Sequence, residues 1–217
     1  MSQPASLVVL ISGSGSNLQA IIDQCADKTI NASICRVISN KADVKGLARA
    51  EAAGITTDVI DHTQYADRDT FDAALIEVID QCKPDLVVLA GFMRILTEGF
   101  VTHFKGRLIN IHPSLLPKYQ GLNTHQRAID AGDSEAGASV HFVTEELDGG
   151  PVIAQAKVLV EANDTAETLA KRVLTVEHGI FPAVIGWFAD RRLQLDNNQV
   201  LFDQQTLSSP IQWPLAN

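Results

Sequence analysis

The chain of 217 residues lacks the features typical of membrane proteins and of secreted, disulfide-rich proteins. Its apolar runs, such as LVVLIS at 7–12, are too short to span a bilayer, and its amino terminus has neither the basic flank nor the cleavage site of a signal peptide. The cysteines, Cys25, Cys35 and Cys82, show no CxxC or Cys/His spacing. We therefore expect a cytoplasmic protein with reduced core thiols, no zinc site and no membrane association.

Positive charge is scarce. The chain has 17 Lys and Arg against 26 Asp and Glu, which gives a formal net charge of −9. Without a general basic face we expect no binding of nucleic acid, so any anionic substrate must be held by local features. Proline and glycine are few, and no repeat, low-complexity tract or linker is evident. The length suits one substantial core, so we expect a single domain over residues 1–217.

Short apolar runs alternate with segments of helical periodicity through the first half of the chain. The runs are apolar at consecutive positions, as expected for strands buried on both faces. Strands that alternate with helices imply right-handed crossovers and therefore an α/β fold, with a Rossmann-like, mainly parallel open sheet and helices on both faces. The expected strands are 7–12, 32–39, 56–61, 84–91 and 107–112, and the expected helices are 16–26, 45–53 and 68–82.

The second half has a different pattern. Residues 138–160 resemble two strands around an Asp-Gly turn, so we expect antiparallel strands in this part. A short helix is expected at 124–131 and a long one at 166–189, which Pro182 should kink or divide. Residues 193–202 resemble a hairpin over an Asn-Asn turn, and the last residues look loosely ordered.

A glycine-rich turn, ISGSGSNLQAII at 11–22, joins the first strand to the first helix. Gly13 and Gly15 permit close backbone approach, Ser16 and Asn17 can cap the helix, and a helix N-terminus attracts phosphate. The turn lacks the third glycine of dinucleotide folds and the lysine of a P-loop. A phosphate site and an ordinary tight connection are equally good interpretations of this turn.

The stretch RLINIHPSLLP at 107–117 sets two polar residues at the end of an apolar strand. Since side chains alternate across a strand, Asn110 and His112 share one face, and Pro113 ends the ladder. Carboxyl ends of parallel strands are where open α/β sheets bind ligands. An amide donor beside an imidazole suits stabilising an oxyanion and moving a proton, whereas a lone histidine here would more simply be structural.

Two further stretches have two interpretations each. ELDGGPVI at 146–153 is first a hairpin-turn signal, and Asp148 is catalytic only if its carboxylate folds back against His112. LAGFMRIL at 89–96 is either an exposed apolar loop, able to wall a pocket for a flat heteroaromatic ring, or a continuation of the core.

Together these stretches resemble the folate-dependent formyltransferase family over nearly the whole chain. The most specific element is Asn-x-His-Pro-Ser with a downstream Asp in a hydrophobic–Asp–x–Gly setting. The matching segments are VVLISGSGSNLQAI (8–21), AGFMRIL (90–96), NIHPSLLP (110–117), GASVHFVTEELDGGPVI (137–153) and TVEHGIFP (175–182).

The resemblance implies transfer of a formyl group from 10-formyltetrahydrofolate, as co-substrate, to the amine of glycinamide ribonucleotide. Asn110 and His112 would stabilise the tetrahedral intermediate, with His112 as proton donor. Asp148 would favour the protonated form of His112 and help to move the proton to the departing folate nitrogen. No metal and no covalent enzyme intermediate are implied.

The resemblance also implies binding residues and an organisation of the chain. Residues of about 1–100 would bind the ribonucleotide phosphate, and residues of about 101–217 would be catalytic and bind folate. Partners would be small-molecule substrates only, and the protein would be a monomer or a homodimer. The ribonucleotide would contact Gly15, Ser16, Asn17 and Glu177, and the folate would contact Arg68, Met93, Arg94, Ile95, Leu96, Asn110, Thr144, Glu145, Glu146, Leu147 and Asp148.

Departures from the family pattern lie outside the catalytic triplet. Ser14, Gln120, Asn123 and Leu174 differ from the residues expected there, which puts fine substrate contacts in doubt but not the reaction. His125 and His141 could hold the catalytic side chains in place without contacting the substrate, or be structural histidines.

Four other functions are weaker. A formyltetrahydrofolate deformylase would carry an amino-terminal regulatory domain, and a methionyl-tRNA formyltransferase a basic carboxyl-terminal domain; we expect neither here. A non-catalytic nucleotide-binding module would not need the full Asn110, His112 and Asp148 set. A nicotinamide-dependent dehydrogenase would need the complete glycine fingerprint and an acidic residue after the second strand, where Ser39-Asn40-Lys41 stands.

Overall fold

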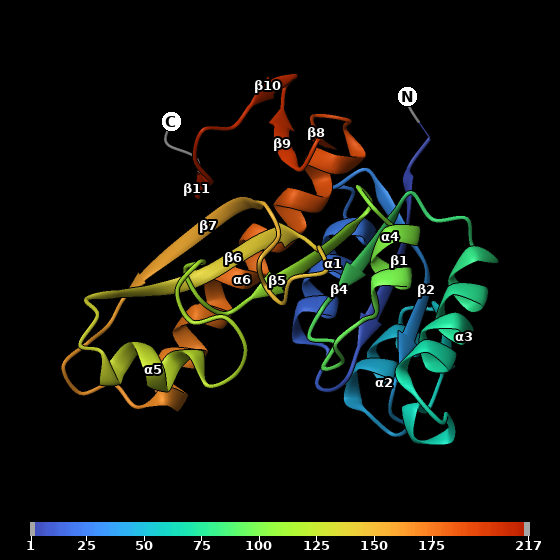
Figure 1. Cartoon of the computed structure of the whole chain (residues 1–217), viewed down its shortest axis with the longest axis horizontal. Coiled ribbons are helices and arrows are strands. Elements are labelled where there is room, and N and C mark those ends of the chain that lie inside the picture. The colour runs from blue at the N-terminus through green and yellow to red at the C-terminus, as the bar shows by residue number, and fades with distance from the viewer. Residues whose placement is uncertain (1–2, 215–217) are drawn as a thin grey trace. The chain divides into compact units, whose positions relative to one another are not determined.

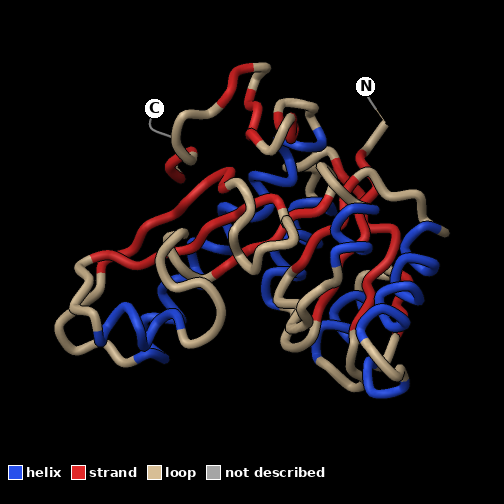
Figure 2. Tube along the Cα trace, viewed as in Figure 1, coloured by secondary structure: helices blue, strands red, loops and turns tan. Residues whose placement is uncertain are grey.

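The structure is a computed structural model that describes residues 3–214. The chain forms two compact units, the first ending at Asn110 and the second beginning at Ile111. Figure 2 shows helices and strands alternating through the first unit, as the sequence predicts. Among residues 3–214, none of the helices combines the length and apolarity needed to cross a membrane.

The first unit is built on a parallel sheet with β1 (Ala5–Ile11) at its centre. β1 pairs with β2 (Ala32–Ser39) on one side and with β4 (Leu86–Leu89) on the other. β3 (Thr56–Val59) pairs with β2, and β5 (Leu108–His112), which continues past the end of this unit, pairs with β4. All four pairings are parallel. The predicted two-sided burial is confirmed for residues 7–11 of β1 and for β4, but it is wrong for the edge strand β3, in which no residue is buried.

The strand order places helices on both faces of this sheet. The chain moves outward from β1 to β3 and then returns to β4 on the other side of β1. Because crossovers are right-handed, that reversal puts the helices before and after it on opposite faces. Contacts agree, since α1 packs against α2 and α3 against α4 (Figure 1). The helices are α1 (Ser16–Ala26), α2 (Lys45–Ala52), α3 (Arg68–Asp80) and α4 (Glu98–His103), with a 3₁₀ turn, η1 (His62–Gln64), before α3.

The second unit contains the antiparallel strands that the sequence predicts. β6 (Glu135–Phe142) pairs antiparallel with β7 (Val152–Leu159), and the long helix α6 (Ala166–Ala189) packs on both strands (Figure 1). The short helix α5 (Thr124–Asp130) packs on α6. The expected hairpin is confirmed by β8 (Leu193–Asp196) and β9 (Gln199–Phe202), which form a three-stranded antiparallel sheet with β10 (Gln205–Thr206).

α6 is continuous through Pro182, so the proline does not divide the helix. Ile180, Phe181, Val184 and Ile185 around the proline are fully buried, and their packing offsets one missing hydrogen bond. The end of the chain is more ordered than expected. β11 (Ile211–Trp213) pairs parallel with β7, whereas residues 215–217 lie outside the described part of the chain.

The expectation of reduced core thiols is wrong for two of the cysteines. Cys35, exposed on β2, and Cys82, just after α3, form a disulfide, and Cys25 is a partly buried free thiol. The two bonded residues are separated by 47 positions in sequence. Their proximity results from the crossover through α3, which cysteine spacing alone does not reveal.

The glycine turn starts α1 in a different way from the one expected. Gly15, not Ser16 or Asn17, is the N-cap residue, and no side chain caps the helix there. Its φ of 68° lies in the left-handed region that favours glycine. A Cβ placed on Gly15 would lie 2.5 Å from the Cα of Gly46 in α2. The close approach of α1 and α2 therefore requires glycine at this position.

We expect Gly15→Ala to destabilise the first unit. The substitution adds the left-handed backbone penalty to a steric conflict with Gly46, for a total of about 2 kcal/mol or more. Denaturant unfolding followed by circular dichroism measures the change. Gly99→Ala is the matched control, since a Cβ at exposed Gly99 in α4 meets only the Thr97 hydroxyl at 3.9 Å; its effect should be below about 1 kcal/mol. Equal effects of the two variants would contradict the steric argument.

Candidate active site

Asn110 and His112 lie at the carboxyl end of β5, where the sequence predicts them. Alternation along the strand directs both side chains to one face. Asn110 is partly buried and His112 is 6% exposed. The strand ends here because Pro113 cannot extend the ladder and Ser114 N–H closes a turn by donating to the His112 carbonyl at 2.9 Å.

Asp148 folds back against His112. It lies in the loop between β6 and β7, with a φ of 49°, and Gly149 N–H donates to the Glu146 carbonyl at 3.0 Å to close the turn. The Asp148 Oδ2 atom is 3.4 Å from His112 Nδ1. The Asp-Gly-Gly segment is therefore both a turn and the source of a carboxylate beside the imidazole, so its two interpretations are compatible.

The second ring nitrogen of His112 also faces an acceptor. Its Nε2 atom is 2.9 Å from the Tyr119 carbonyl oxygen, which can only accept, so we assign a proton to Nε2. Since the Asp148 carboxylate faces Nδ1, the doubly protonated ring has an acceptor at each nitrogen. An acceptor atom on a bound substrate would have to replace the Tyr119 carbonyl to receive the Nε2 proton.

Backbone and side-chain groups compensate the buried charge of Asp148. Its side chain is 9% exposed, and a carboxylate so buried requires donors. Gly121 N–H donates to Oδ2 at 2.9 Å. The Gln120 amide donates at 3.3 Å to the backbone carbonyl of Asp148, which holds the loop but does not compensate the carboxylate. His141 Nε2 lies 3.8 Å from Oδ1.

Two further histidines near the site are biased toward the neutral form. Burial lowers the pKa of His141, although the hydrogen bond to the Phe142 carbonyl and the charge of Asp148 act in the opposite direction. Burial and then the nearby charge of His112 lower the pKa of His125. His112 Nδ1, at 3.4 Å, lies closer to the Asp148 carboxylate than His141 Nε2, at 3.8 Å.

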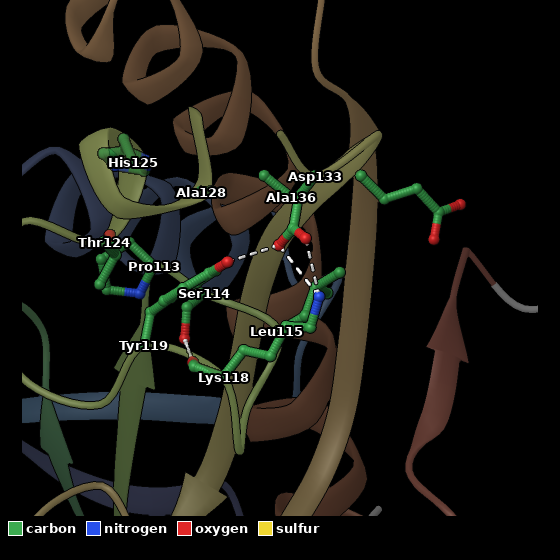
Figure 3. Close-up of a pocket in the computed structure, with 11 residues that line it drawn as sticks. Pro113, Ser114, Leu115, Lys118, Tyr119, Thr124, His125, Ala128, Asp133 and Ala136 are labelled. Carbon is green, nitrogen blue, oxygen red and sulfur yellow. Dashed lines mark hydrogen bonds and ion pairs between the residues drawn. The ribbon is translucent and has the colours of Figure 1, made fainter. Parts of the chain in front are cut away.

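Asp133 fixes the segment 118–121, whose backbone supplies the Tyr119 carbonyl and the Gly121 N–H. Lys118 Nζ lies 2.9 Å from the Asp133 carboxylate, and the Tyr119 hydroxyl donates to it at 2.8 Å (Figure 3). These bonds, with that from Lys118 foremost, lower the pKa of Asp133. A cavity of about 10 Å³ beside this cluster has room for a single water, so it cannot hold a nucleotide or a folate.

The glycine turn in the first unit is fixed from the side of α2. Gly46 N–H donates to the Gly13 carbonyl at 3.1 Å, and Arg49 Nε donates to the Ser14 carbonyl at 2.9 Å. The N–H groups of the first turn of α1 have no intrahelical acceptor, and the helix dipole is positive there. A turn at a helix N-terminus can bind phosphate, but these bonds equally suit a tight strand-to-helix connection, so the phosphate site stays a prediction.

The segment after β4 is an exposed apolar loop. Met93 is 61% and Ile95 54% exposed, so the alternative of a core continuation is wrong for these two residues, although Phe92 is buried. Arg94 and Leu96 are partly buried, and Arg68 is exposed as the first residue of α3.

The remaining predicted residues lie on two elements of the second unit. Glu177 is a buried residue of α6 with 7% exposure. Thr144 is partly buried, and Glu145, Glu146 and Leu147 are exposed in the loop between β6 and β7. No cluster of three or more His, Cys, Asp or Glu side chains in residues 3–214 could hold a metal ion.

The Tyr119 carbonyl and the Gly121 N–H, which contact His112 and Asp148, were not predicted from the sequence. Every residue has these backbone groups, so the residue types give no signal for them.

The lowered pKa of His141 predicts pH-dependent stability. The unfolded chain binds a proton at this histidine with a pKa of about 6.5, whereas the folded protein binds it only at lower pH. Below about pH 6.5 the unfolded state therefore holds more protons, and the free energy of unfolding falls with falling pH by at most about 1.4 kcal/mol per unit from this group.

His141→Asn, whose amide nitrogen takes the place of Nδ1 and can still donate to the Phe142 carbonyl, should make this fall shallower. Urea unfolding at a series of pH values between about 5 and 7 measures the slope. A residual slope from His125 is expected in the variant, and an unchanged slope would contradict the assignment to His141.

Comparison with known proteins identifies the family. The formyl transferase family matches residues 5–185. The chain is 56% identical over 202 residues to the phosphoribosylglycinamide formyltransferase of Escherichia coli (strain K12), which covers 93% of this chain and 95% of that protein. It is 48% identical over 194 residues to the trifunctional purine biosynthetic protein adenosine-3 of Homo sapiens, covering 89% of this chain and 19% of that protein.

A solved structure agrees with this match. The phosphoribosylglycinamide formyltransferase from Coxiella burnetii, solved in complex with CHES, has a TM-score of 0.93 and 52% sequence identity, covering 97% of this chain and 100% of that one. The family match extends from β1 into α6 and includes Asn110, His112 and Asp148. This chain is therefore a member of the formyl transferase family.

Proposed function

We propose that this protein transfers the formyl group of 10-formyltetrahydrofolate to the amine of N1-(5-phospho-D-ribosyl)glycinamide. The products are formylglycinamide ribonucleotide and tetrahydrofolate, in de novo purine biosynthesis. Similarity over nearly the whole chain to proteins named for this activity supports the proposal. The observation that carries it is the buried Asp148 carboxylate 3.4 Å from His112, two residues from Asn110 on β5.

The substrate amine attacks the formyl carbon, a C–N bond forms, and the carbonyl oxygen becomes an oxyanion. The amide of Asn110 and the protonated imidazole of His112 donate to that oxyanion, a charge that develops only in the transition state. The bond from carbon to the folate N10 atom then breaks. Asp148 stabilises the imidazolium and assists transfer of the proton from the attacking amine to N10.

The phosphate of the ribonucleotide binds at the glycine turn. Gly15, Ser16 and Asn17 supply backbone and hydroxyl donors at the positive end of α1, and Glu177 binds the ribose hydroxyls. Because the phosphate is recognised by a helix N-terminus, a protein with a net charge of −9 can bind this anionic substrate.

The folate binds to the exposed apolar loop after β4 and to the loop between β6 and β7. Met93 and Ile95, at 61% and 54% exposure, give its ring apolar contacts. Arg68 binds further along the folate. The complete set is Arg68, Met93, Arg94, Ile95, Leu96, Asn110, Thr144, Glu145, Glu146, Leu147 and Asp148.

The proposal includes the organisation of the protein. The chain functions as one formyltransferase domain in the cytoplasm, as a monomer or homodimer with small-molecule partners. Residues of about 1–100 bind the ribonucleotide phosphate, and residues of about 101–217 supply catalysis and folate contacts.

Product identification tests the reaction directly. The purified protein is mixed with 10-formyltetrahydrofolate and glycinamide ribonucleotide, and the products are identified by mass spectrometry. Formylglycinamide ribonucleotide and tetrahydrofolate in equal amounts are expected. Free formate without the formylated ribonucleotide would refute the proposal and indicate a deformylase.

We expect His112→Ala and Asp148→Ala each to lower kcat by about 100-fold or more, because both side chains act on the transition state. The Kd of the ribonucleotide should stay within about threefold, since neither residue binds the phosphate. Steady-state kinetics and calorimetric titration give the two values.

His103→Ala is the matched control, because His103 is exposed on α4, where it pairs with Asp80 at 2.9 Å. It should retain normal turnover. Near-normal turnover in either site variant would exclude the assigned roles.

A further inference from the structure

Ser12, which directly follows β1, makes two attachments to the segment after β4. Its N–H donates to the Gly91 carbonyl at 3.1 Å, and its hydroxyl oxygen accepts from Met93 N–H at 2.8 Å. Ser12 is 7% exposed, so water competes little for these bonds. One buried residue therefore fixes the backbone at the start of the exposed apolar loop.

Asn40 orients the Ser12 hydroxyl. The Asn40 Oδ1 atom lies 2.5 Å from Ser12 Oγ, and since a carbonyl oxygen can only accept, the hydroxyl proton points to Asn40. This leaves a lone pair of Ser12 Oγ directed to Met93 N–H. Asn40 is 1% exposed, and its own carbonyl lies 3.0 Å from His62 Nδ1, so it is itself held in place.

The other end of the loop has a second anchor. Asp72 of α3, 2% exposed, accepts from Thr97 N–H at 2.6 Å. Between Met93 and Thr97 the chain forms neither helix nor strand. The loop is therefore held at both ends by buried side chains, while Met93 and Ile95 project into solvent with 61% and 54% exposure.

We propose that Ser12 is a positioning residue for the folate-binding loop, acting through its hydroxyl and oriented by Asn40. The inference rests on the proposed function, which assigns residues 93–96 to folate binding. Ser12 fixes the backbone of a segment whose side chains must stay exposed to receive the ligand. Pre-organisation of this kind lowers the entropy cost of binding.

Removal of the hydroxyl should therefore weaken folate binding and leave the chemical step intact. In Ser12→Ala, Met93 N–H loses its acceptor and Asn40 Oδ1 loses its donor, so the loop must be ordered by the ligand. His112 and Asp148, which move the proton, are not contacted by Ser12 in any bond described above.

The experiment compares Ser12→Ala with Ser33→Ala, the same change at an exposed serine of β2. We expect the KM for 10-formyltetrahydrofolate to rise about tenfold in Ser12→Ala, the effect of losing about one hydrogen bond. We expect kcat and the Kd of the ribonucleotide to stay within about threefold. Ser33→Ala should match the wild type. An unchanged KM, or a fall in kcat without a rise in KM, would overturn the proposal.

A second measurement does not depend on activity or on the folding of the variant. Amide hydrogen exchange in the wild-type protein should show Met93 N–H, which donates to Ser12, protected at least about tenfold more than the amide of the exposed residue Glu145. Equal exchange rates would overturn the positioning role. If the wild type forms no formylated ribonucleotide, the proposed function fails, whereas this exchange result still decides whether Ser12 holds the loop.

Discussion

A buried carboxylate must be surrounded by donors, and in the second unit that requirement determines how the segments around His112 are arranged. Asp148 reaches His112 only because the β6–β7 loop turns sharply, with a left-handed backbone at Asp148 itself. Gly121 N–H supplies a further donor, and Asp133 holds the segment from which that donor comes. His112 Nδ1 lies 3.4 Å from the Asp148 carboxylate, whereas His141 Nε2 lies 3.8 Å from it and burial lowers the pKa of His141.

The first unit follows a different principle, in which topology places polar groups together. The carboxyl ends of parallel strands face the same edge of the sheet, and the order of the strands reverses between the neighbouring strands β1 and β4. The glycine turn and the exposed apolar loop follow these two strands, and Ser12 joins them by hydrogen bonds. In the proposed function, the glycine turn offers N–H groups to the phosphate, and the loop after β4 offers apolar side chains to the folate ring.

Much of this organisation could be predicted because it depends on periodicity. Apolar runs identified the strands, and alternation placed Asn110 and His112 on one face. Contacts made by the backbone could not be predicted, since the Tyr119 carbonyl and the Gly121 N–H would be present with almost any side chain at those positions. Contacts between residues far apart in the sequence could not be predicted from it either. Examples are the Cys35–Cys82 disulfide, the close approach of Gly15 to Gly46, and the pairing of β11 with β7.

The use of backbone groups around His112 and Asp148 has an evolutionary consequence. A carbonyl or N–H persists when a side chain mutates, provided that the backbone path is kept. That condition constrains Tyr119, whose hydroxyl donates to Asp133, and Gly121, whose φ of 78° favours glycine, more than it constrains Gln120. Gln120 adds a bond to the Asp148 backbone carbonyl but is not the donor to its carboxylate. The side chain at position 120 can therefore change without removing the backbone bonds to His112 and to the Asp148 carboxylate.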